Sequence, residues 1–242
     1  MFVLQTENGQ ILTDMGKAIF ESISFERWLH PNTEIQYRLQ EDTSPISQRD
    51  IPVGSIEWTE RVSGLHIVPT NLPPELWSPP FILRGRTGIG TKNDLAAQLA
   101  DGPLFVKSAT KTKAWDARVI SAKELSMLPE DEKYFFSNCV IFTNEWRIFI
   151  FHNKIEDVKQ YLGSWAEGLT PNDVTLITNL CGDIRLPFPA YTIDIGRTDK
   201  GLLELIEIHP FISCGLYGFD NLPVIRRMAA QAWRYFANNQ NG

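Results

Sequence analysis

From residue 103 onward, short apolar runs alternate with polar turns along the chain. The runs are PLFVK, ARVIS, YFFSNCVIF and EWRIFIFHNKI, and they are rich in β-branched and aromatic residues. Runs of this length bounded by turn residues are typical of β-strands. The second half of the chain is therefore predicted to be rich in strands, while the segment IEDVKQYLG is too short and mixed to assign.

Four segments instead carry apolar residues at the spacing of an α-helix. Thr13 and Asp14 cap the first, which continues to Ile23, and Gly102 closes the second, KNDLAAQLADG. The third, PNDVTLITNL, has Pro171 in its first turn. The fourth is NLPVIRRMAAQAWRYF, and its apolar stripe consists of Ile225, Met228, Ala229, Ala232 and Phe236.

Residues 41–90 are rich in proline and glycine, and we interpret them as irregular connections between short strands. No internal repeat or low-complexity tract is visible. The mixture of helical and strand patterns predicts an α+β protein. We expect a smaller N-terminal subdomain of residues 1–100 and a strand-rich region of residues 101–242.

The composition is that of an ordinary soluble globular protein, with 43% hydrophobic and 21% charged residues among 242. A net charge of −6 argues against a broad nucleic-acid surface. No apolar stretch reaches the length of a membrane span, and the start MFVLQTENGQ does not resemble a signal peptide. We therefore expect a cytoplasmic protein without nucleic-acid or membrane partners.

Several possible nucleophile and phosphate motifs fail on inspection. Cys139, Cys181 and Cys214 form no Cys-x-x-Cys pair, so we expect reduced thiols in apolar surroundings. Ser213 and Cys214 lie outside any Gly-x-Ser-x-Gly elbow. The segment RGRTGIGTK lacks the Gly-Lys-Ser/Thr of a phosphate loop.

Acidic side chains interrupt the apolar hairpin YTIDIGRTDKGLLELIEIHP, which spans residues 191–210. Alternation along a strand predicts that Glu207 and His209 share one face with Leu203 and Leu205. A short turn would bring Asp194 opposite or diagonal to Glu207. Facing carboxylates repel each other, so the pair indicates either a bound cation such as Mg²⁺ or a solvated outer face.

Basic residues stand beside or within apolar strands at two further places. Lys107 ends the run PLFVK and precedes a polar loop with Lys111 and Lys113, a common arrangement for meeting phosphate. Arg147 shares a strand face with Glu145 inside NEWRIFIF. An arginine there needs either an anionic ligand or an internal acid, and the sequence leaves both open.

Together these motifs resemble the ATP-grasp superfamily, in particular its phage and bacterial clade named for one arginine and two lysines. The resemblance runs from about Ile51 to the C-terminus. IPVGSIEW and NLPPEL are similar to its N-terminal segment and FVKSATKTKAW to its lysine motif. EWRIFIF resembles its arginine strand, AYTIDIG its aspartate strand and ELIEIHPFISCGLYG its Glu-x-Asn segment.

The resemblance implies ATP held between two α+β subdomains, and it implies roles for particular residues. Arg147 and Lys113 would be catalytic, with Arg147 binding a phosphate or an acyl phosphate. Asp194, Glu207 and His209 would hold Mg²⁺, with Mn²⁺ as an alternative. The nucleotide would contact these residues: Lys107, Lys113, Ser137, Asn138, Cys139, Val140 and Glu145.

The implied activity is that of a carboxylate ligase, which forms an acyl phosphate that an amine or thiol then attacks. Its substrate would be a peptide, amino acid or protein carboxylate, in a host cytoplasm if the chain is phage-encoded. His209 replaces the usual asparagine, and imidazole suits transition metals better than Mg²⁺. The alternatives are a degenerate ATP-binding module and a phosphotransferase.

Overall fold

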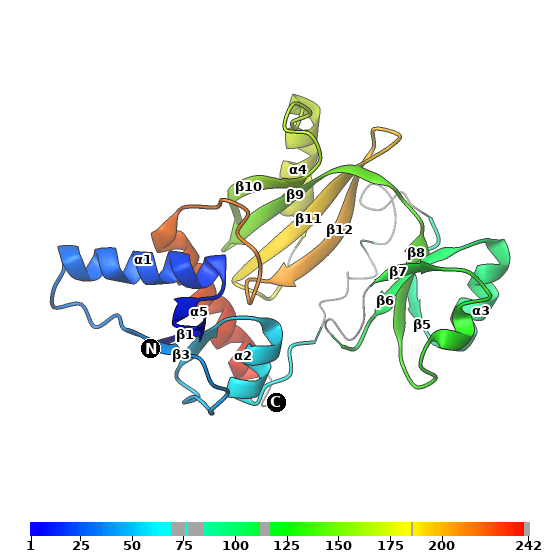
Figure 1. The fold of residues 1–242 in the computed structure, drawn as a ribbon. Helices are drawn as coiled ribbons and strands as arrows, with labels where there is room; N and C mark the ends of the chain where they lie inside the picture. The colour runs from blue at the N-terminus through cyan, green and yellow to red at the C-terminus, as the bar shows by residue number, and fades with distance from the viewer. Residues whose placement is uncertain (69–75, 77–84, 112–116, 185, 240–242) are drawn as a thin grey trace.

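The computed structural model describes residues 1–68, 76, 85–111, 117–184 and 186–239, and three four-stranded sheets lie within them. In Figure 1 the sheet of β9 to β12 lies between the N-terminal sheet and the sheet of β5 to β8. Helices and strands alternate in an irregular order, which confirms the predicted α+β class.

The N-terminal sheet is built around β1, which pairs in parallel with β3 and β4 and antiparallel with β2. Thr13 caps α1 as predicted, since its hydroxyl accepts a hydrogen bond from the Gly16 amide. The elements are β1 (Phe2–Glu7), β2 (Gln10–Ile11), α1 (Asp14–Leu29), β3 (Tyr37–Gln40), β4 (Ile51–Val53) and α2 (Ile56–Ser63).

The helix α2 corrects the interpretation of residues 41–90 as irregular connections. Ser55 caps its first turn by accepting from the Trp58 amide, and Gly64 ends it in the left-handed conformation, with φ of 70°. Trp58 and Val62 are buried against Val3 of β1. The helix is short and lies in a proline- and glycine-rich region, so its periodicity is too brief to be recognised.

The middle sheet has the strand order β5-β8-β6-β7. Leu104 and Val106 of β6 point into an apolar core with α3, and the alternation of the strand sends Lys107 to the opposite face. The run YFFSNCVIF does not form one strand, because β8 ends at Asn138 and β9 begins at Phe142. The elements are β5 (Gly88–Gly90), α3 (Lys92–Gln98), η2 (Leu99–Asp101), β6 (Leu104–Ser108), β7 (Arg118–Ile120), η3 (Leu125–Met127) and β8 (Tyr134–Asn138).

The third sheet is antiparallel throughout, with the order β10-β9-β11-β12. The unassigned segment IEDVKQYLG forms most of β10, which follows β9 through a two-residue turn at His152 and Asn153, both with positive φ. The elements are β9 (Phe142–Phe151), β10 (Lys154–Leu162), α4 (Pro171–Asp183), β11 (Ala190–Thr198), β12 (Leu203–Pro210) and α5 (Leu222–Asn239).

The two faces of this sheet have different surroundings. Trp146, Ile148 and Ile193 lie on the face that packs with Ile177 of α4. The other face continues through Phe149 into the core that α1 and α5 form with the N-terminal sheet. The predicted apolar stripe of α5 is buried in that core. The polar side chains of the candidate site therefore lie on the face that is turned away from α4.

A β-bulge in β12 corrects the predicted sharing of faces. Asp194 pairs with Glu207, but Ile195 pairs with Leu205, so Ile206 is an extra residue between them. Leu205 consequently points into the core under α4, as Leu203 does, whereas Glu207 points to the face of Asp194. The predicted common face of Leu203 and Leu205 with Glu207 was wrong because the bulge inverts the alternation.

None of the described helices combines the length and the apolar character needed to span a bilayer. The division into subdomains of residues 1–100 and 101–242 stays a prediction. Limited proteolysis with mapping of the cut sites would test it, since exposed connections between domains are cleaved first.

Candidate functional site

The carboxylates of Asp194 and Glu207 face each other on neighbouring strands. Their Cα positions are paired between β11 and β12, as the hairpin pattern predicted. His209 joins them, because one ligand atom from each of the three residues lies within 4.8 Å of the others. Two carboxylate oxygens and an imidazole nitrogen are donors that suit a divalent cation, and the imidazole favours a transition metal such as Mn²⁺.

Glu207 is also contacted from the other lobe. Lys107 of β6 places its Nζ 3.1 Å from Glu207 Oε2, and His209 places its Nε2 2.7 Å from Glu207 Oε1. Burial alone would raise the pKa of Glu207, but hydrogen bonds and charge from His209 and Lys107 hold that pKa well below its ordinary value. Glu207 is therefore a carboxylate at neutral pH. Lys107 also lies 5.4 Å from the ring centroid of Phe135.

Arg147 forms a buried, bidentate ion pair with Asp194. Its Nε lies 2.8 Å from Oδ1 and its Nη2 lies 2.6 Å from Oδ2 of Asp194, and the two side chains are only 8% and 2% exposed. Arg147 Nη1 donates to the carbonyl of Gly215 at 3.2 Å. Of the two alternatives for Arg147, the internal acid is therefore present. Each Asp194 oxygen keeps a further lone pair, so the pair does not prevent metal binding.

Two tyrosines that sequence reasoning missed complete the surroundings of this ion pair. The rings of Tyr161 and Tyr217 stack with centroids 4.7 Å apart, and the Arg147 guanidinium lies 5.0 Å from the Tyr217 centroid. Tyr161 donates its hydroxyl hydrogen to Asp194 Oδ2 at 3.4 Å. Tyr161 comes from the segment left unassigned and Tyr217 from a loop, so no periodic signal marked either residue.

A cavity of about 310 Å³ opens between the middle sheet and the third sheet beside these residues. That volume is within the range of small-molecule sites. Aromatic and aliphatic side chains form its walls, including Ile206, which the bulge exposes to it. Polar groups line the rest. The lining residues predicted to bind nucleotide or metal are Lys107, Ser137, Asn138, Cys139, Val140, Glu145 and Glu207.

The segment that joins β8 to β9 has free backbone groups at the edge of the cavity. No other described residue forms a backbone hydrogen bond with the amides or carbonyls of Cys139 and Val140. Backbone donors and acceptors beside an apolar slot suit the edge of a planar heterocycle such as adenine. The cavity therefore offers an apolar slot, polar backbone at one side and a lysine with two acids at another.

The remaining predicted residues divide into two groups. Arg147, Asp194 and His209 lie beside Glu207 through the contacts above. Lys113 lies outside the described residues, so its predicted catalytic role stays a prediction.

The cysteines differ in their surroundings. Burial raises the pKa of Cys181 and of Cys214 to about 12, so neither is a thiolate at neutral pH. This agrees with the rejection of Cys214 as a nucleophile. Cys139 is exposed, which corrects the expectation of an apolar environment for all three thiols. Its exposure follows from its position just beyond the end of β8.

Comparisons with known proteins agree with this geometry. A family model matches residues 84–227, and it describes an ATP-grasp domain of family 2 in the clade named for one arginine and two lysines. A solved RimK domain ATP-grasp protein from Sphaerobacter thermophilus is 10% identical with a TM-score of 0.53, each chain covered in full at 100%. The D-cycloserine synthetase DcsG is 12% identical with a TM-score of 0.51, and 99% of each chain is covered.

A further structure illustrates how much of longer proteins the chain matches. A RiPP-associated ATP-grasp ligase from Chryseobacterium gregarium, in complex with ADP and a leader and core peptide, is 12% identical with a TM-score of 0.42. The match covers 66% of this chain and 56% of that one, so the chain spans little more than half of that protein. No curated protein matches the sequence.

Proposed function

The chain belongs to the ATP-grasp superfamily and has its fold, and from this premise we propose that it is an ATP- and metal-dependent ligase. The proposed reaction joins a carboxylate to an amine or thiol through an acyl phosphate. One observation carries the proposal. Lys107 from one lobe and Asp194, Glu207 and His209 from the other converge beside a cavity of about 310 Å³.

In the proposed complex, the adenine occupies the apolar slot and contacts the backbone of Cys139 and Val140. Lys107 exchanges its contact with Glu207 for a phosphate oxygen, which it meets as a point charge. Asp194, Glu207 and His209 hold a divalent cation, which offsets the negative charge of the phosphates when bound. Tyr161 and the buried Arg147 keep the Asp194 carboxylate in a fixed orientation.

The proposed chemistry needs positioning and charge rather than an activated nucleophile. An oxygen of the substrate carboxylate attacks the γ-phosphorus, the bond to the β-phosphate oxygen breaks, and ADP leaves with the electron pair. The amine or thiol then attacks the acyl carbon, loses its proton and expels inorganic phosphate. The substrate acid is proposed to be that of a peptide, an amino acid or a protein.

Trapping with hydroxylamine tests this proposal without knowledge of the natural amine. The protein is incubated with ATP, Mn²⁺ or Mg²⁺, hydroxylamine and a pool of amino acids and peptides. A ligase is expected to release ADP and phosphate and to yield a hydroxamate whose mass identifies the acid. ADP release with a phosphorylated hydroxyl product would instead identify a phosphotransferase.

A second candidate function is nucleotide binding without turnover. The observation that favours it is the internal saturation of the site, in which Arg147 occupies Asp194, and Lys107 and His209 occupy Glu207. Nucleotide affinity without ADP formation across the whole pool of acids and both metals would support this candidate over the ligase.

Lys107→Ala is expected to raise the dissociation constant for ATP by about tenfold or more, because one charge-assisted contact to phosphate is lost. Isothermal titration calorimetry with a non-hydrolysable ATP analogue measures this. Lys123→Ala is the matched control, since Lys123 is exposed on the same lobe. Equal affinity of the Lys107→Ala variant and the wild type would remove Lys107 from the nucleotide site.

His209→Asn is expected to shift the metal preference from Mn²⁺ towards Mg²⁺, because an amide oxygen replaces an imidazole nitrogen. The ratio of the two dissociation constants, measured by titration in the presence of the ATP analogue, should change by about tenfold. An unchanged ratio would mean that His209 does not contact the metal. Competition between Mn²⁺ and Mg²⁺ followed by electron paramagnetic resonance gives the same ratio without any need for turnover.

A further inference from the structure

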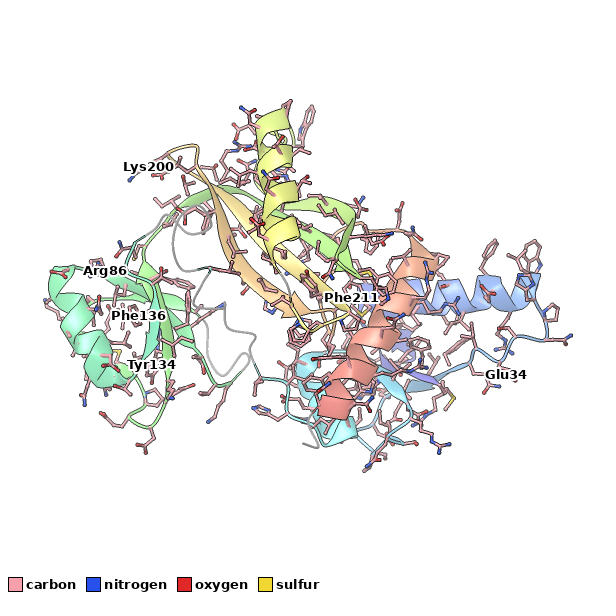
Figure 2. All side chains as sticks on the ribbon, turned by 180° about the vertical axis from the view of Figure 1, so that it is seen from behind. Glu34, Arg86, Tyr134, Phe136, Lys200 and Phe211 are labelled. Carbon is pink, nitrogen blue, oxygen red and sulfur yellow. The ribbon has the colours of Figure 1, made fainter. Side chains whose placement is uncertain are left out.

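A second cavity lies in the N-terminal part of the molecule. It has a volume of about 450 Å³, and it is lined by Met1, Phe2, Glu34, Ile35, Gln36, Ile51, Arg226, Arg227, Ala230 and Arg234. In Figure 2 Glu34 lies at one end of the molecule, while Arg86 and Lys200 lie at the other. Lys200 lines a pocket beside Cys139 and Val140, so this second cavity, which we call the arginine groove, is remote from the nucleotide site.

One wall of the arginine groove is a single face of α5. Arg226, Ala230 and Arg234 follow each other at intervals of four residues, which places them on the same side of the helix. Arg227 lies seven residues before Arg234 and borders the same face. At 1.5 Å per residue, Arg226 and Arg234 are separated by about 12 Å along the helix axis. The wall therefore presents positive charge along its length rather than at one point.

These arginines are only partly neutralised by the protein. Arg226 Nη2 lies 3.5 Å from Glu26 Oε2, and its Nε is buried without a hydrogen-bond partner among the described residues. Its side chain is 12% exposed. Within the described ranges, Arg227 and Arg234 form no ion pair, and both are exposed. The protein carries a net charge of −6, so this local concentration of cations differs from the rest of the chain.

The opposite wall is mainly apolar. Phe2 and Ile51 come from the paired strands β1 and β4, and Ile35 comes from the connection that leads to β3. Glu34 is the one acidic residue among those that line the arginine groove. A ligand that fits must therefore be negatively charged on one side and apolar on the other. A bare phosphate or a nucleic-acid backbone meets only the first condition.

We propose that the arginine groove binds an extended acidic peptide segment of a partner or substrate protein. Alternate side chains of an extended chain point to opposite sides, so acidic residues can face α5 while apolar residues face Phe2 and Ile35. Acidic residues four positions apart in such a chain are about 13 Å apart, which matches the separation of Arg226 and Arg234. Arginine forks suit carboxylates and bind them through paired hydrogen bonds.

Fluorescence anisotropy with a short fluorescein-labelled peptide, in which glutamate and leucine alternate, tests this proposal. The peptide is expected to bind the full chain and to bind less tightly as salt is raised. The double variant Arg227→Gln/Arg234→Gln is expected to raise its dissociation constant by about tenfold or more. Both arginines are exposed, so this variant is expected to fold.

The matched control is Arg49→Gln/Arg61→Gln, which removes the same charge from exposed positions outside the arginine groove. The control is expected to keep the wild-type affinity for the peptide, and both double variants are expected to bind the ATP analogue as the wild type does. Equal peptide affinity of the two double variants would overturn the proposal.

Two competitor ligands decide the class of ligand. A peptide with glutamine in place of glutamate should bind at least about tenfold more weakly, and equal binding would show that charge plays no part. A single-stranded DNA oligomer of the same charge should also bind more weakly. Tighter binding of the DNA, lost in Arg227→Gln/Arg234→Gln, would overturn the peptide proposal and identify a nucleic-acid site instead.

Discussion

Glu207→Gln is expected to abolish metal-dependent ADP formation while the chain stays folded. The substitution keeps the shape of the side chain but removes the charge that Lys107 and His209 share in the free protein and that the proposed cation would share in the complex. Loss of a metal-binding carboxylate should reduce the rate by about a hundredfold or more. The measurement is ADP release in the hydroxylamine assay, with both metals.

The folded state should survive this change. The side chains of Lys107 and Glu207 are 27% and 29% exposed, so their ion pair is partly solvated and is expected to contribute only about 1 kcal/mol to stability. The low pKa of Glu207 means that this contribution is present at neutral pH and is lost only in acid, as the carboxylate becomes protonated. Thermal unfolding at neutral pH should therefore shift by a few degrees at most.

Glu130→Gln is the matched control for this experiment. Glu130 forms an ion pair with Lys92 at 2.6 Å but does not line the nucleotide cavity. The control should release ADP at the wild-type rate. A Glu207→Gln variant that also turns over at the wild-type rate would exclude Glu207 from the mechanism, whatever its geometry.

Asp194→Asn is expected to cause the largest loss of stability among the substitutions considered. It leaves the guanidinium of Arg147 without a charged partner, and that group is 8% exposed. Breaking a buried ion pair at one side costs about 3–5 kcal/mol, because a buried charge is left uncompensated. In a chain of this size the loss corresponds to a fall in melting temperature of roughly 6–20 °C. Urea unfolding of the two proteins gives the free energy directly.

The double variant Arg147→Met/Asp194→Leu separates stability from function. Apolar residues of similar size often replace a buried ion pair without loss of stability, so the double variant should recover most of what Asp194→Asn loses. It should nevertheless form no ADP, because the proposed metal site has lost a carboxylate. Full activity in the folded double variant would show that neither residue takes part in the reaction.

Much of the local structure could be predicted from the sequence. Helices α1, α3, α4 and α5 follow from capping residues and apolar spacing, and most strands follow from β-branched runs. The facing of Asp194 and Glu207 was predicted from the length of one hairpin. Such features depend on residues that are close in sequence, so alternation and turn chemistry determine them.

The bulge at Ile206 and the partner of Arg147 could not be predicted in this way. A single inserted residue reverses the faces of Leu203 and Leu205, and nothing in the residue types of β12 distinguishes it from a regular strand. Arg147 was equally compatible with a ligand and with an internal acid. Its pairing with Asp194 depends on the adjacency of β9 and β11, which are separated by β10 and α4 in the chain.

By itself, the sequence determined the helices, most of the strands and a set of charged residues typical of one superfamily. Only the tertiary structure decided which of these charges meet. Lys107 and Glu207 are 100 residues apart and come into contact because two sheets with separate cores face each other across a cavity. Local periodicity contains no information about that docking, since the docking depends on how side chains from distant segments fill one common volume.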